Sequence, residues 1–194
     1  MARQISYDPL LVRQRLLRQF WEHGFAATSL TELEEASGIN RRQLYNGLGD
    51  KRTMFLQALD DFRDMAGRRF LAPLEAETAD LGSIRDLLAT FVELAASGDG
   101  RLGCFVCSTS QEDVAADPEI KAKLDHYFRR IAAAYANALR GAIAKGQLAL
   151  DLQDVEARAN FLMGAQVGMS VLARAGQPPE NIRQLADFAL RVAT

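Results

Sequence analysis

The amino-acid sequence predicts an all-α protein, and three observations support this fold class. Apolar residues recur three or four positions apart in nearly every segment of the 194 residues, which is the spacing of one helix face. No segment alternates apolar and polar residues as a half-buried strand does. The pairs Asp8-Pro9 and Asp117-Pro118 are typical helix starts, because Asp accepts from free backbone N–H groups and Pro has no N–H that needs a partner there.

The first helix is expected to begin at Pro9 and to end at Gly24, since glycine is common directly after a helix. Either Thr28 or Ser29 can then cap a second, short helix. The apolar residues of the first helix that should face the core are Leu10, Leu11, Leu16, Leu17 and Phe20.

Two more helix starts follow closely. Gly38 permits a sharp turn after the second helix, Asn40 can cap a third helix, and Asp50 can cap a fourth that should run from about residue 51 to 70. Two short helices joined by a tight turn have the form of a helix-turn-helix, whose second helix enters the DNA major groove.

The rest of the chain is expected to be helical as well. Pro73 should interrupt the pattern, Ser83 can cap the next helix, and Gly146 should end the longest one. The expected helices cover about residues 83–96, 104–115, 118–145, 151–175 and 180–192, with a connection at 73–82 and a loop at 98–103.

Composition and charge are those of an ordinary globular protein, with 48% apolar residues and a net charge of -2. Residues 1–52 carry eight Lys and Arg against six acidic residues, and the remainder carries 15 against 19, so a weakly basic head precedes an acidic body. No apolar run approaches the roughly 18 residues of a membrane helix, and the N-terminus lacks a signal-peptide pattern. We therefore expect a cytoplasmic protein without membrane contact, in which the two cysteines form no structural disulfide.

The first turn of the third helix carries the side chains best suited to read DNA. Arg41 and Arg42 can pair with guanine and Gln43 with adenine, although either arginine can instead bind phosphate. Two adjacent arginines alone would more often be a solvated helix face, but the complete capped pattern favours DNA. The expected DNA-binding residues are Thr28, Ser29, Thr31, Asn40, Arg41, Arg42, Gln43, Tyr45 and Lys51.

Residues 8–60 resemble the N-terminal domain of the TetR family of bacterial transcriptional repressors. The matching motifs are Gly-Phe-Ala-Ala-Thr-Ser at 24–29, Ala-Ser-Gly-Ile at 36–39, Leu-Tyr-Asn-Gly-Leu at 44–48 and Gly-Asp-Lys at 49–51. The resemblance implies that Tyr45 and Lys51 contact the DNA backbone and that the recognition helix reads bases. It also implies a helix-turn-helix domain at residues 1–52 and a regulatory and dimerisation domain at 53–194.

Two positions depart from the family pattern. Gly47 stands where the family usually has His, so one phosphate contact is missing, and Leu48 replaces the usual Phe in the core. More of the phosphate binding should then come from Arg52 or from the hydroxyl groups near the start of the second helix.

The body is expected to contain a largely apolar ligand pocket. Residues 101–109 are similar to a Gly-Cys-Leu-x-x-Asn-Thr stretch in one branch of the family, which by that resemblance begins a helix lining the regulatory cavity. The expected ligand-binding residues, each of which would also suit an ordinary core, are Phe62, Met65, Phe91, Cys104, Cys107, Gln111, Tyr135 and Met169.

Cys104 and Cys107 form a CxxC motif that has three interpretations. Two thiols on one helix face can sense an oxidant or an electrophile, and a cysteine at a helix N-terminus can have a lowered pKa. Plain burial in the core is the second interpretation. A zinc site is the third and the weakest, because only His23 and His126 could join the thiols as nitrogen ligands. We expect no metal and no cofactor.

Small residues in the helix near 151–175 allow another helix to approach closely. The family uses its last two helices as a dimer seam, and a buried helix of a monomer is the alternative. The expected dimer-interface residues are Phe161, Gly164, Ala165, Gly168, Leu172 and Leu185.

These expectations combine into one hypothesis, a homodimeric repressor that binds palindromic operator DNA and is released by a small-molecule effector. The alternative is a repressor that senses redox or electrophile signals through Cys104 and Cys107. The sequence contains no nucleophile–base constellation, phosphate loop or metal-ligand cluster, so an enzyme is not expected.

Overall fold

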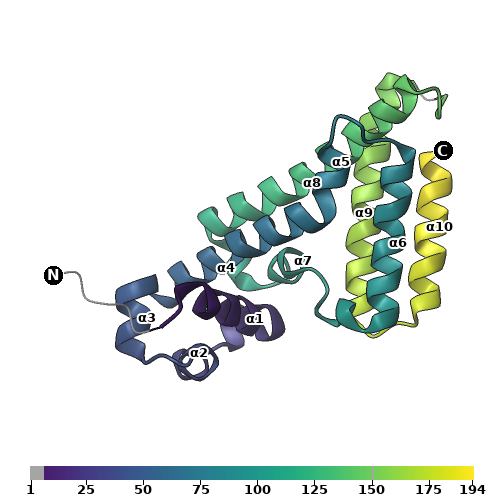
Figure 1. Cartoon of the computed structure of the whole chain (residues 1–194). Coiled ribbons are helices and arrows are strands. Elements are labelled where there is room, and N and C mark those ends of the chain that lie inside the picture. The colour runs from purple at the N-terminus through teal and green to yellow at the C-terminus, as the bar shows by residue number, and fades with distance from the viewer. Residues whose placement is uncertain (1–6, 150) are drawn as a thin grey trace.

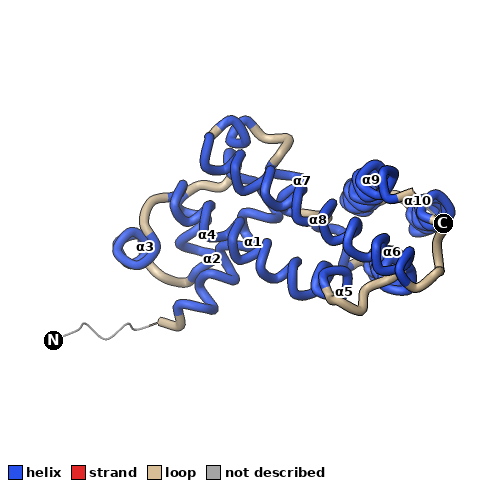
Figure 2. The backbone as a smooth tube through the Cα atoms, turned by 90° about the horizontal axis from the view of Figure 1, so that it is seen from above, coloured by secondary structure: helices blue, strands red, loops and turns tan. Residues whose placement is uncertain are grey.

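The computed structural model describes residues 7–149 and 151–194, and across them the secondary structure is helical without a strand. The all-α prediction is confirmed (Figure 2). The main helices are α1 (Pro9–Ala27), α2 (Leu30–Ser37), α3 (Arg41–Leu48), α4 (Lys51–Ala66), α5 (Ala72–Glu75), α6 (Leu81–Ser97), α7 (Phe105–Thr109), α8 (Pro118–Ala144), α9 (Val155–Arg174) and α10 (Pro179–Ala193).

The molecule is elongated, with the helix-turn-helix at one end (Figure 1). Helices α1, α2 and α3 form this head, and α4 and α8 run from it toward the opposite end. There α6, α9 and α10 pack side by side and form the end of the body. The arrangement separates the predicted DNA-reading helix from the predicted dimer helices by the full length of α4.

The caps of the head form as predicted. Ser29 caps α2, and its hydroxyl accepts from the N–H of Glu32, whose carboxylate accepts from the N–H of Ser29. Asp50 caps α4 by accepting from the N–H of Thr53. Gly38 has a φ of 74°, a left-handed conformation that side chains disfavour, and it turns the chain between α2 and α3.

The hydrophobic core runs without a break from the head into the body. Phe55 of α4 packs edge-on against Phe20 of α1 and against Phe105 of α7, with ring centres 5.1 and 5.4 Å apart. The expected division at residue 52 therefore marks the start of α4 and not a gap in packing. At the start of α1 the inward side chain is Val12, whereas Leu10 and Leu11 are exposed, contrary to the sequence prediction.

Three predicted boundaries in the body are wrong. The helix expected to stop before Pro73 continues, because a π-helical turn at Gly67–Leu71 restarts it and places Pro73 in the first turn of α5, where no N–H is needed. Helix α6 begins at Leu81 with Asp80 as its cap, and Ser83 only completes the capping pair.

The third wrong boundary is that of the helix expected at 104–115. Helix α7 ends at Thr109, and a separate 3-10 turn covers Asp113–Ala116. The hydroxyls of Ser108 and Ser110 donate to backbone carbonyls one turn back, and such bonds compete with continued helix formation. The expected loop at 98–103 contains a short 3-10 turn at Asp99–Leu102.

Candidate DNA-binding surface and effector cavity

The helix-turn-helix is held rigidly, which fixes the direction of the exposed face of α3. Leu33 of α2 and Leu44 of α3 are fully buried in the core, and Ile39 of the turn between the two helices is buried with them. A short helix needs such tertiary support, because an isolated segment of eight residues is marginal in water.

The two arginines of the first turn of α3 differ in their partners within the protein. Both side chains are exposed, but Arg41 is bound to Glu34 of α2 through Nε at 3.1 Å and Nη2 at 2.9 Å. Arg42 forms no ion pair or hydrogen bond with another residue that the structure describes. Arg42 is therefore the better placed of the two to bind DNA without first giving up a protein partner.

The other two residues of this turn stabilise the helix end. Asn40 accepts from the N–H of Gln43 at 3.0 Å, and the Gln43 side-chain oxygen accepts from the N–H of Asn40 at 3.1 Å. This reciprocal pair satisfies two backbone donors that a helix start leaves free. Base reading by Gln43 must therefore use its amide nitrogen or break the cap.

The hydroxyl groups expected at phosphate are not equivalent. Thr28 is 0% exposed and its hydroxyl donates to the carbonyl of Gly24 at 2.7 Å, so a phosphate contact by this side chain is incompatible with the structure. Ser29 and Thr31 are exposed at the start of α2, with Thr31 Oγ1 3.5 Å from Nη2 of Arg41. These two hydroxyls remain the candidates for phosphate binding.

The predicted backbone anchors also differ in availability. Tyr45 is 44% exposed on α3. Lys51 lies with Nζ 4.4 Å from the centre of the Phe25 ring, and partial burial lowers the pKa of its ammonium group. Arg52 is not available, because it binds both carboxylate oxygens of Asp117 at 2.7 and 2.9 Å. That bond holds the pKa of Asp117 at about 2.

Gly47 lies close to the side chain of Tyr7. A Cβ atom built at this exposed position of α3 would overlap the hydroxyl group of Tyr7. The Tyr7 side chain would therefore have to shift if Gly47 were replaced by a larger residue. Sequence reasoning identified the departure at Gly47 but not the proximity of Tyr7.

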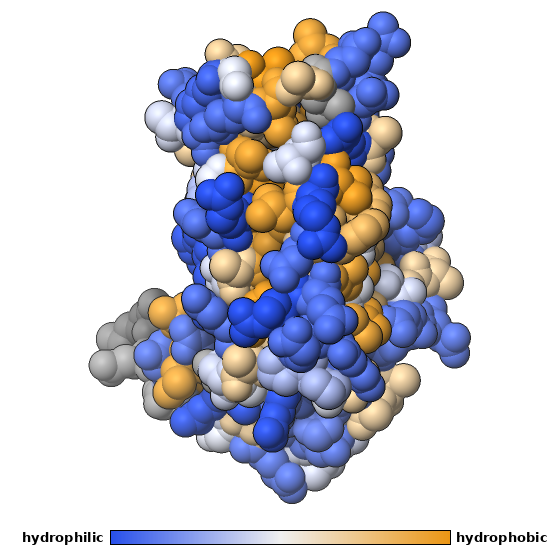
Figure 3. All heavy atoms as spheres, turned by 90° about the vertical axis from the view of Figure 1, so that its right-hand side faces the viewer, coloured by the Kyte–Doolittle hydropathy of each residue, from blue (hydrophilic) through white to orange (hydrophobic). Residues whose placement is uncertain are grey.

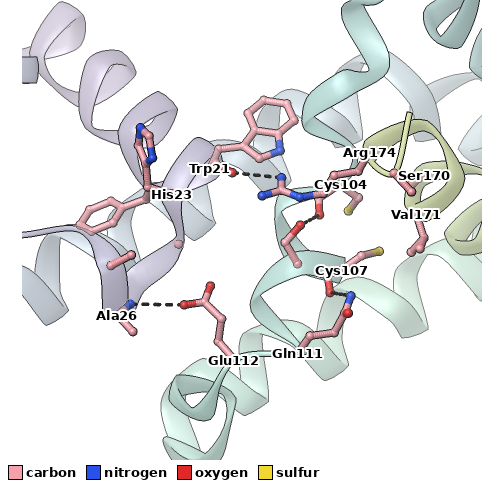
Figure 4. Close-up of a pocket in the computed structure, with 15 residues that line it drawn as sticks. Trp21, His23, Ala26, Cys104, Cys107, Gln111, Glu112, Ser170, Val171 and Arg174 are labelled. Carbon is pink, nitrogen blue, oxygen red and sulfur yellow. Dashed lines mark hydrogen bonds between the residues drawn. The ribbon is translucent and has the colours of Figure 1, made fainter. Parts of the chain in front are cut away.

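Two cavities occupy the region where the head meets the body. The first, which we call the junction pocket, has a volume of about 490 Å³ and lies between α1, α7 and α9 (Figure 4). The second, which we call the aromatic cavity, has a volume of about 80 Å³ and lies among aromatic side chains of α4, α6 and α8. Trp21, Cys104 and Ser170 line both.

The predicted ligand-binding residues divide between these two cavities. Phe62, Met65, Phe91, Cys104 and Met169 line the aromatic cavity. Cys107 and Gln111 line the junction pocket together with Cys104.

Tyr135 lines neither cavity. It is fully buried, and its hydroxyl donates to the side-chain oxygen of Gln166 at 2.9 Å, so the structure does not place it with the other predicted ligand-binding residues.

The two thiols are in direct contact. The side-chain interaction between Cys104 and Cys107 lowers the pKa of Cys104 and raises the pKa of Cys107. Cys104 is half-buried and Cys107 is buried. Cys104 is therefore the thiol with more thiolate character and easier access.

His23 lines the junction pocket together with both thiols, from which it is distant in sequence. Within residues 7–149 and 151–194, however, no three His, Cys, Asp or Glu side chains gather as metal ligands. The same residues contain no helix with the length and apolar character needed to cross a membrane.

On the end of the body that carries α9 and α10, apolar residues gather between hydrophilic ones (Figure 3). Phe161 and Val171 of α9 and Phe188 of α10 are large apolar residues left exposed. Gly164 is exposed beside them with open space around it, whereas Gly168 lies against Leu185 within the protomer. Ala165 is buried and Leu172 is half-buried, so both contribute less to this surface.

Sequence reasoning missed four residues of the junction region, Trp21, Glu112, Gln166 and Arg174. Trp21 lies in the first helix, where its position alone does not indicate a pocket. The other three lie in helices or turns whose local pattern gives no sign of a distant partner. Gly24 was a usable signal for such partners. A glycine that breaks a helix leaves backbone groups on both sides of the break that need hydrogen-bond partners from elsewhere.

Known proteins match this chain along its whole length. The family model for the tetracyclin repressor-like C-terminal domain matches residues 81–188. The HTH-type transcriptional repressor ComR of Escherichia coli is 30% identical over 190 residues, which cover 96% of this chain and 89% of ComR. The uncharacterized HTH-type transcriptional regulator YezE of Bacillus subtilis is 26% identical over 192 residues, or 99% of each chain.

Solved structures show the same similarity in three dimensions. A cysteine-substituted form of the TetR family transcriptional regulator CifR, complexed with a 26-bp double-strand operator DNA, has a TM-score of 0.86 and 27% identity. The match covers 97% of this chain and 98% of that CifR chain.

Proposed function

The chain belongs to the TetR family of transcriptional regulators, and from this premise we propose that it is a homodimeric repressor that binds a palindromic operator and is released by a small-molecule effector. The observation that carries the DNA-binding part is the exposed first turn of α3, with Arg42 unpaired among the described residues on a helix fixed by buried Leu33 and Leu44. A regulator of this kind acts in the cytoplasm, where the operator is.

The dimer is supported by the exposed apolar side chains of α9 and α10. A second copy that covers Phe161, Val171 and Phe188 would remove large apolar side chains from water, which favours association. One recognition helix gives modest affinity, whereas two heads on one dimer bind both halves of a palindrome. A small-molecule effector is supported by the junction pocket, whose volume suits a small ligand.

Selection of bound fragments from the genomic DNA of the source organism tests the proposal. We expect a small set of enriched sequences that share an inverted repeat, and gel shifts in which a dimer binds each of them. Recovery of no shared sequence by a folded, dimeric protein would reject operator binding.

A thiol sensor is the second candidate, and the hydrogen bond between Cys104 and Cys107 favours it. In this alternative an oxidant takes two electrons from the pair, the two thiols lose their protons and a disulfide forms. Oxidation by hydrogen peroxide should then weaken operator binding about tenfold, in the usual range of coupling between sites. The measurement is a gel shift before and after oxidation and after reduction with dithiothreitol. Both Cys104→Ser and Cys107→Ser should abolish the response, and a response that persists in both variants would reject this alternative.

A further inference from the structure

Helix α1 is broken at Gly24, close to the point where the head meets the body. Gly24 has a φ of 82° and a ψ of 175°, so it is not helical although residues on both sides are. A break of this kind leaves backbone carbonyls before it and backbone N–H groups after it without their helical partners. Something else must satisfy those groups.

The body supplies a carboxylate for the N–H groups. Glu112, which follows α7, accepts from the N–H of Phe25 at 2.8 Å. It also accepts from the N–H of Ala26 at 3.3 Å, a bond drawn in Figure 4. Its carboxylate lies so close to Gly24 that an added Cβ atom there would meet it at 2.9 Å. Glu112 thus caps the second segment of α1 from outside the head.

The body also supplies a cation for the carbonyls. Arg174, at the end of α9, donates to the carbonyl of Trp21 at 3.2 Å and to that of Glu22 at 3.4 Å. It donates as well to the carbonyl of Leu102 at 2.6 Å, which also accepts from the indole N–H of Trp21. Glu112 and Arg174 therefore hold the two sides of one backbone break.

The junction pocket lies between these two caps. Figure 4 shows Glu112 on one side of it and Arg174 on the other, with Cys104 and Cys107 between them. Arg174 has no acidic partner among the described residues and is bound only by neutral carbonyls. An ionised acceptor forms a stronger hydrogen bond with a guanidinium group than a carbonyl does, so an anion in the pocket would compete for Arg174.

We propose that the junction pocket is the effector site and that it takes a small molecule with an anionic group, an inference that rests on the proposed function. The anionic group binds Arg174 and draws it away from the carbonyls of α1. The head then loses one of the two caps that the body supplies to α1, and its attachment to the body is weaker. Arg174 lies one turn beyond Val171, an exposed residue of the proposed dimer face on α9. The bonds from Arg174 to the carbonyls of α1 therefore connect that face to the head.

Removal of each cap tests the coupling without a ligand. In Glu112→Ala and Arg174→Ala, hydrogen exchange at residues 21–28 should be about tenfold faster and operator affinity about tenfold weaker, a usual coupling between sites. Glu112→Gln keeps an acceptor oxygen and should retain most of the protection. Glu156→Ala is the matched control, because Glu156 is an exposed carboxylate of α9 that pairs with Arg140 within the body. Unchanged exchange at residues 21–28 in both cap variants would overturn the proposal.

Two thiol reagents of similar size test the ligand class. In a Cys107→Ser background, the Cys104 thiolate attacks the sulfenyl sulfur of 2-sulfonatoethyl or 2-hydroxyethyl methanethiosulfonate. A disulfide forms, methanesulfinate leaves with the electron pair, and the thiol proton passes to the buffer. The anionic adduct should weaken operator binding about tenfold more than the neutral adduct, a difference in the usual range of coupling between sites. In an Arg174→Gln variant the difference should disappear.

Each other result of this experiment counts against the proposal. Equal effects of the two adducts, or a difference that persists without Arg174, would overturn the anionic class. Absence of both adducts in the mass spectrum would show a pocket closed to small molecules. If the unlabelled protein binds no operator, the proposed function fails, whereas the exchange measurement still decides whether the caps hold the head.

Discussion

Gly164→Leu should split the dimer and lower operator affinity by about 10²-fold or more, the range lost when two linked binding events become independent. A Cβ atom built on Gly164 meets nothing within 4 Å, so a larger side chain fits the isolated protomer. Leucine also favours the middle of a helix over glycine by about 1 kcal/mol, so the protomer should not lose stability. A partner helix that packs on this glycine would be pushed away.

Sedimentation and gel shift measure the two effects, and thermal unfolding checks the fold. Ala122→Leu is the matched control, because Ala122 is a small exposed residue on α8 and not on α9 or α10. It should leave the dimer and operator binding as they are. If Gly164→Leu remains dimeric with unchanged operator affinity, the seam does not involve this face of α9.

Arg42→Ala should weaken operator binding by about 1–3 kcal/mol, or roughly 5- to 150-fold, as expected for loss of a bidentate contact with a base. Arg41→Ala should have a smaller effect, because Arg41 must first give up its two bonds to Glu34, and that cost offsets its contact with DNA. Titration of operator and of random DNA with each variant, at one fixed salt concentration, measures both effects.

The comparison with random DNA separates two roles for Arg42. A base contact affects only the operator, whereas a phosphate contact weakens both DNAs and lowers the salt dependence. Lys121→Ala removes one exposed positive charge from α8 and serves as the control. A larger loss in Arg41→Ala than in Arg42→Ala would show that the Glu34 pair opens freely and that Arg41 reads the DNA.

Much of the fold was predictable because its signals are local. Asp8, Ser29, Asn40, Asp50 and Asp117 all cap the helices that the sequence placed after them. A cap depends on a side chain and on N–H groups two or three residues away, so a short stretch of sequence carries all the information. The prediction failed at Pro73, where a π-helical turn upstream changed which position of the helix the proline occupies.

The candidate site was predictable in its residue types but not in their availability. The sequence placed Arg41 and Arg42 at the start of the reading helix, yet only packing of α2 beside α3 brings Glu34 to Arg41. Thr28 matched a family motif, but it follows the last residue of α1, where its side chain is buried and bonds to Gly24. Tyr135 was predicted to contact a ligand, but its hydroxyl donates to Gln166, 31 residues away, and a local pattern does not reveal such a partner.

The sequence by itself therefore determined the all-α class, the helix-turn-helix and its caps, since each follows from hydrogen bonds or apolar spacing within one or two turns. Only the tertiary structure decided how the head is held on the body. Glu112 lies 87 residues from Phe25, and Arg174 lies 153 residues from Trp21, and no local rule connects such positions. They meet because burial of one continuous core brings α1, α7 and α9 together, and the backbone groups freed at Gly24 then need partners.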